Sequence, residues 1–201
     1  MGHSQADKAQ SRERILREAA AQIRDAGLES VSVARLMRSA GLTHGGFYGH
    51  FASRDELLAE ALQRALVEGA AASRAATAAA ATSAAPTKAA APAPTFDAFA
   101  RSYLSRGHRD ARASGCAVAA LAADAARAEA PVRAVMSEHV ERFIARAAEL
   151  AGSSDEEAMF AVSAMVGGLL LSRVLVDADR SDAMLKAVRA GLAERAASAP
   201  R

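Results

Sequence analysis

The chain has 201 residues, of which 51% are hydrophobic and 24% charged, and its net charge is +2. It contains 56 alanines, whereas aromatic residues make up only 4%. Alanine favours helices, and strands need the β-branched and aromatic side chains that are scarce here, so we expect an all-α fold. The single cysteine excludes an internal disulfide framework and a cysteine-based zinc site.

We expect the protein to bind neither a metal nor a cofactor and not to be inserted in a membrane. The five histidines are scattered without the spacing of metal ligands. Residues 1–24 alternate in charge and lack the apolar run of a signal peptide. The longest uncharged stretch late in the chain, residues 158–172, is too short to span a bilayer and indicates a buried helix. We therefore expect a cytoplasmic protein.

Helical periodicity and capping residues predict four helices in the first third of the chain. Their predicted ranges are 7–26, 33–40, 44–50 and 54 to beyond 66. The third contains three glycines, each of which costs about 0.5–1 kcal/mol of helix stability relative to alanine. We expect Phe47 and Phe51 to hold it in place by packing onto Leu36 and Leu57.

The middle of the chain is low in complexity. Residues 70–95 contain 15 alanines and three of the five prolines, and from about residue 76 to residue 95 we predict a flexible Ala/Pro-rich link. A turn is predicted at 108–114 and a frayed tail from residue 196. Further helices are expected at 96–104, 117–127, 131–151, about 154–171 and from 181 onward.

The second and third predicted helices have the layout of a helix-turn-helix, with Gly41-Leu42-Thr43 between them. Residues 30–54 contain three arginines, two histidines and no aspartate or glutamate. A surface that faces phosphates needs such an absence of negative charge, because a nearby carboxylate repels the DNA backbone. Glycines at the start of the third helix also let its free N–H groups come close to a phosphate.

The run from Val33 to Leu57, VARLMRSAGLTHGGFYGHFASRDEL, resembles the N-terminal domain of TetR/AcrR-family transcriptional regulators. The resemblance extends from about residue 12 to residue 66, and Arg54 replaces the lysine of the family pattern Phe-x-Ser-Lys. It implies a three-helix DNA-binding domain at 1–54, followed by a helical ligand-binding and dimerisation bundle at 55–201.

The resemblance also implies a partner and a mode of action. Members of this family bind palindromic double-stranded operator DNA as homodimers, and a small-molecule inducer releases them. We therefore expect a transcriptional regulator, most simply a repressor, rather than an enzyme.

Carried over residue by residue, the resemblance assigns DNA contacts to eight residues. The start of the recognition helix and its expected base contacts are Thr43, His44, Gly45 and Gly46. The expected phosphate contacts are Ser32, Tyr48, His50 and Arg54. A partly buried core aromatic is the alternative interpretation of Tyr48.

Segments around the cysteine resemble a subgroup in which some members sense electrophiles or oxidants through a cysteine that follows a glycine. Cys116 stands at a predicted helix N-terminus with Arg109 and Arg112 upstream, and both features favour a reactive thiolate. The alternative is a small buried hydrophobe. Together with Cys116, the candidate lining of a ligand cavity comprises Tyr103, Met136, Val140, Phe143 and Met165.

The last two predicted helices are expected to form the dimer interface. Residues 158–175 are too apolar to face water in a monomer, unless they form a wholly internal core helix. The expected partner face is Met184, Leu185, Val188 and Leu192.

Two other functional classes compete with the regulator. An enzyme would use Cys116 as nucleophile with His108 or His139 as base, although no signature orients either histidine. A helical scaffold that binds only protein would leave the acid-free window and the glycine-rich helix unexplained.

Overall fold

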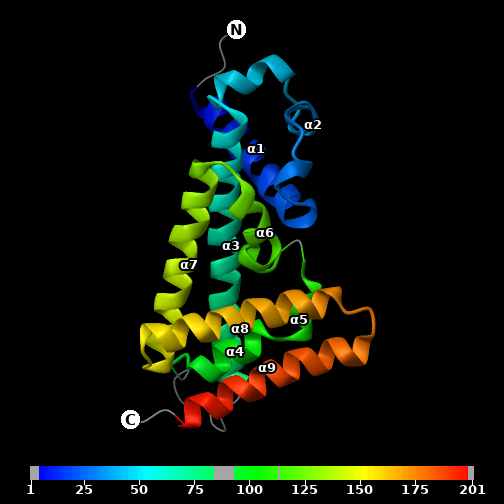
Figure 1. The fold of residues 1–201 in the computed structure, drawn as a ribbon. Helices are drawn as coiled ribbons and strands as arrows, with labels where there is room; N and C mark the ends of the chain where they lie inside the picture. The colour runs from blue at the N-terminus through cyan, green and yellow to red at the C-terminus, as the bar shows by residue number, and fades with distance from the viewer. Residues whose placement is uncertain (1–4, 84–92, 113, 199–201) are drawn as a thin grey trace.

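The structure is a computed structural model that describes residues 5–83, 93–112 and 114–198. Every regular element in this part of the chain is a helix, as the composition predicted (Figure 1). Two 3-10 helices occur early, η1 (Leu28–Ser30) and η2 (His44–Gly49). The α-helices are α1 (Gln5–Ala26), α2 (Val33–Ser39), α3 (Arg54–Ser83), α4 (Phe96–Tyr103), α5 (Arg106–Asp110), α6 (Ala117–Arg127), α7 (Ala130–Ala151), α8 (Asp155–Val174) and α9 (Ala178–Ser198).

The molecule is elongated, with the N-terminal helices at one end. Helices α3 and α7 run side by side along its length, and α8 and α9 cross them at the opposite end (Figure 1). Helix α6 lies between these two ends and contacts α1, η1, α3, α7 and α8. It therefore connects the N-terminal helices to the rest of the bundle.

Two hydrophobic cores meet at α6. The first joins α1, α2, η2 and the start of α3 to α6 and the beginning of α7, and it includes Leu121 and Ala125. The second is formed by α4, α7, α8 and α9 and includes Ala119 from α6. The predicted domain boundary at residue 54 coincides with the start of α3, but the first core continues across it.

The predicted flexible link is wrong over residues 76–83, because α3 continues without a break to Ser83. The Thr77 hydroxyl donates to the carbonyl oxygen of Ser73 at 2.8 Å, and Thr82 bonds to Ala78 in the same way. These hydroxyls are thus satisfied within the helix, and the surrounding alanines are strong helix formers. The three prolines lie beyond the end of α3, and residues 84–92 of the link lie outside the described residues.

Other boundaries also differ from the prediction. The third predicted helix is the 3-10 helix η2, in keeping with the poor helix propensity of its glycines. The turn predicted at 108–114 overlaps the short helix α5, which Ser105 caps by accepting from the N–H of His108. Helix α1 already includes Gln5, and α9 begins at Ala178 and continues to Ser198, through the tail predicted to fray.

Helix α8 is the most apolar element described. It begins with a complete capping box between Ser154 and Glu157. By length and composition it is the one described helix that could cross a membrane, with a mean hydropathy of 1.4, yet it packs here against α7 and α9. The Gly168 position explains the close approach of α9, because a Cβ there would lie 2.8 Å from Cγ2 of Val188.

Candidate DNA-binding surface and ligand cavity

Two buried phenylalanines hold η2 against the N-terminal core, as the sequence predicted. Phe47 and Phe51 are both buried, and their rings stack with centroids 5.6 Å apart. They share this core with Leu36 and Leu57. Gly41, with φ +74°, makes the turn between α2 and η2, a backbone conformation that favours glycine. A short, glycine-rich segment is thereby fixed at the surface by side chains rather than by its own helical stability.

The outer side of η2 is exposed. Thr43, His44, Gly45 and Tyr48 face solvent, whereas Gly46 is half-buried. Tyr48 is 72% exposed and its ring forms a T-shaped pair with that of Phe47, so its interpretation as a core aromatic is wrong. A Cβ added at Gly45 would meet nothing within 4 Å, so this backbone is open to a surface brought against it.

The remaining predicted DNA contacts are more constrained. Ser32 is half-buried at the start of α2 and its side chain makes no capping hydrogen bond. His50 is half-buried; burial, together with the charges of Lys8 and Arg12, lowers its pKa, which disfavours a cationic phosphate contact. Arg54 donates to the carbonyl oxygen of Leu28 at 3.3 Å and pairs with the highly exposed Glu29.

Two arginines on α2 were not predicted as contacts. Arg35 and Arg38 are both exposed, and neither forms an ion pair among the described residues. Their positions in the acid-free window were the available signal. Because Arg54 already has an anionic partner, these two side chains are the freer cations on the surface around η2.

A second feature is a cavity of about 700 Å³ between α3, α4, α7 and the segment that leads into α6. Of the predicted lining residues, Tyr103, Cys116 and Phe143 do line it. The other three do not: Met136 and Met165 are buried in the two cores, and Val140 packs against both. Periodicity placed the five candidates other than Cys116 on apolar helix faces and could not distinguish a cavity wall from a filled core.

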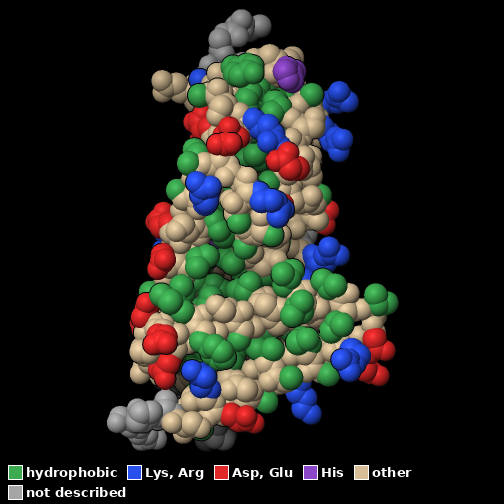
Figure 2. Space-filling view, viewed as in Figure 1, with side chains coloured by type: hydrophobic (Ala, Val, Ile, Leu, Met, Phe, Trp, Pro, Cys, Tyr) green, Lys and Arg blue, Asp and Glu red, His purple; other side chains and the backbone are tan. Residues whose placement is uncertain are grey.

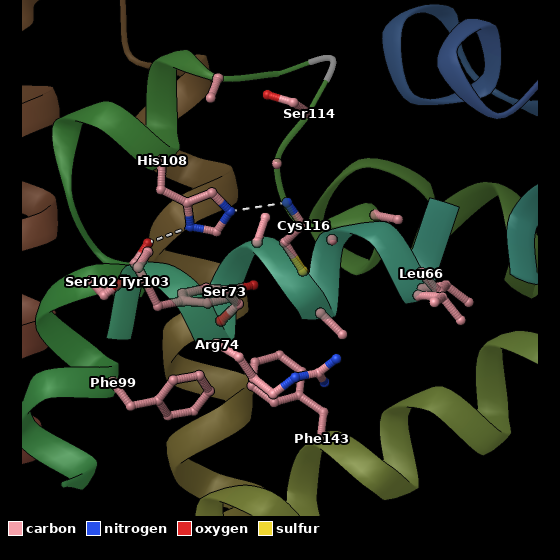
Figure 3. Close-up of a pocket in the computed structure, with 18 of the residues that line it drawn as sticks. Leu66, Ser73, Arg74, Phe99, Ser102, Tyr103, His108, Ser114, Cys116 and Phe143 are labelled. Atoms are coloured by element: carbon pink, nitrogen blue, oxygen red, sulfur yellow. Dashed lines mark hydrogen bonds between the residues drawn. The ribbon is translucent and has the colours of Figure 1, made fainter. Parts of the chain in front are cut away.

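His108 fixes the wall of the cavity near Cys116 (Figure 3). Its Nε2 accepts the backbone N–H of Cys116 at 2.9 Å, so its proton is on Nδ1, which donates to the carbonyl oxygen of Tyr103 at 2.7 Å. Burial lowers the pKa of His108 and keeps the ring neutral. Since Nε2 already accepts a backbone N–H, it is not available as a base for the Cys116 thiol.

Neither predicted arginine is held against Cys116. Arg109 is committed to Asp110, Ser181 and Asp182, each through a hydrogen bond of 2.8 Å, and Arg112 is exposed. The arginine packed beside this segment is Arg173 of α8, which donates to the carbonyl oxygens of His108 and Arg109 and would lie 3.1 Å from a Cβ at Gly115. Arg173 is 57 residues away from Cys116 in sequence, so proximity along the chain could not identify it.

The N-terminal helices match a known protein family. The profile of "Bacterial regulatory proteins, tetR family" matches residues 15–61, which span most of α1, the helix-turn-helix and the start of α3. These residues form a TetR-family DNA-binding domain. No curated protein sequence matches the chain. The matched stretch contains the run from Val33 to Leu57, so the predicted family of this domain is confirmed.

Solved structures share the fold over nearly the whole chain. A TetR transcriptional regulator from Chloroflexus aurantiacus superposes with a TM-score of 0.74 at 18% identity, covering 96% of this chain and 97% of its own. A TetR-family regulator from Cytophaga hutchinsonii gives the same TM-score at 16% identity, covering 96% and 98%. The multidrug binding protein EbrR, solved in complex with proflavin, gives 0.62 at 22% identity, covering 92% and 98%.

Proposed function

We propose that this regulator is a homodimeric repressor that binds a palindromic operator and leaves it when a small molecule enters the cavity. The observation that carries the DNA-binding part is the surface of η2, where exposed Thr43, His44, Gly45 and Tyr48 stand in a window without carboxylates. Base contacts come from the start of η2, and phosphate contacts come from Tyr48 and the surrounding arginines.

Gel-shift titrations with DNA from beside the regulator's own gene test this surface. Replacing Arg38 or Arg54 by Ala weakens binding to every sequence and reduces the slope of log affinity against log salt by about one. Replacing His44 by Ala changes the preferred sequence instead. Arg133→Ala, on the exposed side of α7, is the matched control and leaves binding unchanged. Parent-like binding by all three surface variants refutes the assigned surface.

The dimer part of the proposal rests on the outer face of α8. Figure 2 shows hydrophobic side chains gathered along α8 and beside α9. Leu171 is 52% exposed and Val174 68%, with Met159, Phe160 and Leu170 also exposed on the same helix. Monomeric proteins seldom leave such a row of large apolar side chains in water. We propose that this face pairs with the same face of a second copy.

The predicted partner face on α9 needs revision. Leu185 and Leu192 are buried within the subunit, and Val188 packs against Gly168, so of the four predicted residues the half-buried Met184 is left for the interface. Leu171→Glu then gives a monomer in sedimentation velocity and lowers operator affinity. Ala134→Glu, which adds the same charge to an exposed position on α7, keeps the dimer. A dimeric Leu171→Glu protein contradicts the proposed interface.

The inducer part rests on the position of the cavity. Cys116 and Ala117 line it at the start of α6, and the same helix reaches the N-terminal domain, where Asp124 accepts the backbone N–H of Leu28 at 3.1 Å. A ligand that displaces the start of α6 therefore acts on the DNA-binding helices through one rigid element. EbrR, which shares this fold, binds proflavin, so a molecule of that size is the natural comparison.

The position of Cys116 suggests that the inducer reacts with its thiol. The side chain is half-buried and lines the cavity, so an adduct would enlarge a packed wall. Operator binding before and after treatment with a quinone, in the parent and in Cys116→Ser, separates the two kinds of inducer. Equal sensitivity of the two proteins makes the inducer non-covalent.

A further inference from the structure

The charged groups of the cavity are all of one sign. Its lining includes Arg74 from α3 and Arg142 and Arg146 from α7, and among the described lining residues there is no aspartate or glutamate. His108 and His139 also line it; burial lowers the pKa of each, and both ring nitrogens of His108 are already hydrogen-bonded to the protein. A cationic guest would meet no counter-charge among the described lining residues, whereas an anionic guest would meet arginines.

Two of the three arginines have no anionic partner of their own. Arg142 pairs with Glu138, one turn earlier on the same helix. Arg146 lies over the ring of Phe99, 5.9 Å from its centroid, and makes no ion pair among the described residues. Arg74 likewise has none there. Because Arg74 and Arg146 stand on different helices, an anion between α3 and α7 can accept hydrogen bonds from both sides.

A buried hydroxyl lines the same space. Tyr103 is only 3% exposed and lines the cavity, and its hydroxyl makes no hydrogen bond to nitrogen or oxygen among the described residues; its polar neighbour is the Cys116 thiol. Burial, and secondarily the charge of Cys116 and a hydrogen bond with it, raises the pKa of this phenol well above its ordinary value, so the hydroxyl stays a donor. Sulfur is a weak acceptor, so an acceptor oxygen on a ligand would satisfy this buried donor better.

Aromatic rings form the floor beside these donors. Phe99 contacts Phe143 in a T-shaped pair with centroids 5.7 Å apart, and Tyr103 lies 5.5 Å from Phe143 and 6.3 Å from Phe99. Such edges and faces accept a further planar ring in offset or edge-on contact. In Figure 3 the labelled Phe99, Tyr103 and Phe143 surround the space that Arg74 also reaches.

We propose that the cavity binds an aromatic organic anion, with its ring on Phe99 and Phe143, its charge toward Arg74 and Arg146, and an acceptor oxygen on the Tyr103 hydroxyl. This proposal specifies the ligand class of the small-molecule response proposed above and rests on it. The large volume, about 700 Å³, favours a guest of two or more fused rings.

Three isosteric fluorescent probes test the charge preference directly. Binding of 9-anthracenecarboxylate, 9-anthracenemethanol and 9-(aminomethyl)anthracene is measured by titration calorimetry on the full chain at fixed salt. The carboxylate binds at least about tenfold more tightly than the alcohol, and the ammonium probe binds more weakly than either. Equal affinities, or tightest binding of the ammonium, overturn the proposal.

Variants then assign the preference to these residues. Arg74→Gln and Arg146→Gln each lower the affinity for 9-anthracenecarboxylate about fivefold and leave the affinity for 9-anthracenemethanol unchanged. The unchanged affinity for the neutral alcohol shows that the variants have lost a charge and not the shape of the cavity. Tyr103→Phe, whose melting temperature is checked against the parent, weakens the carboxylate about tenfold. Arg133→Gln, on the exposed side of α7, changes neither probe. If neither Arg74→Gln nor Arg146→Gln changes the affinity for 9-anthracenecarboxylate, these arginines do not bind the anion and the assignment is wrong.

Gel shifts on the same samples separate this proposal from the proposed function. A protein that binds its operator but none of the three probes refutes the organic-anion site and leaves the DNA-binding function standing. A protein that binds the carboxylate through Arg74 and Arg146 but has no operator supports the site and refutes the regulatory role. Release of the operator by the carboxylate alone, among the three probes, supports both.

Discussion

Asp124 is the direct polar connection between α6 and the N-terminal helices. Its Oδ2 accepts the backbone N–H of Leu28 at 3.1 Å, across 96 residues of sequence. The carboxylate lies against Gly27, whose φ of +86° favours glycine and where a Cβ would come within 2.7 Å of the same oxygen. Replacing Asp124 by Ala removes the acceptor and leaves the Leu28 N–H unpaired.

The expected loss follows from the exposure of the groups involved. A hydrogen bond to a charged group contributes about 1.5–3 kcal/mol, but the Asp124 side chain is 29% exposed, so water partly replaces it and about 1–2 kcal/mol remains. For a chain of this length each 1 kcal/mol lowers the melting temperature by about 2–4 °C. Asp124→Ala therefore melts about 2–8 °C below the parent. Asp124→Asn keeps an acceptor oxygen, so its melting temperature falls less than that of Asp124→Ala.

Arg127→Ala is the matched control for this prediction. It removes the second interaction of Asp124, an ion pair at 2.8 Å whose arginine is 72% exposed, and such pairs contribute about 0–1 kcal/mol. Melting curves by circular dichroism at equal protein concentration compare the four proteins. The prediction fails if Asp124→Ala has the melting temperature of the parent, or if Arg127→Ala lowers the melting temperature as much as Asp124→Ala does. In either case the hydrogen bond to Leu28 does not contribute the expected stability.

Three further predictions concern single positions. Gly45→Ala keeps the melting temperature of the parent, because its Cβ meets no atom of the protein, but it weakens operator binding in gel shifts; unchanged binding would mean that the DNA does not approach this backbone. Gly168→Ala lowers the free energy of unfolding by about 1–2 kcal/mol in urea titrations, since its Cβ would lie 2.8 Å from Cγ2 of the stiff, β-branched Val188; a stabilised variant would show that α9 moves away at little cost. The folded-state pKa of His108 is lowered, so the unfolded chain binds more protons and stability falls as the pH drops below about 6.5; this decline is shallower in His108→Gln, and equal declines in the two proteins would exclude a contribution from His108.

Local sequence determined the secondary structure and the identity of the DNA-binding element. Alanine content and apolar spacing act within a few residues, so the all-α class and the buried pair Phe47 and Phe51 could be predicted. The helix-turn-helix could be predicted for the same reason. Its turn, its two buried phenylalanines and its lack of acidic residues all lie in one continuous stretch of the sequence.

Tertiary packing decided which side chains share a space. Arg173 of α8 bonds the backbone of His108 and Arg109 near Cys116, whereas the Arg109 side chain pairs with Asp110 and Asp182. Apolar periodicity marks a face but not what covers it, so Met165 lies in a filled core while Phe143 lines a cavity. Whether a helix face meets another helix or an empty volume depends on elements far away in sequence, and only the folded chain brings them together.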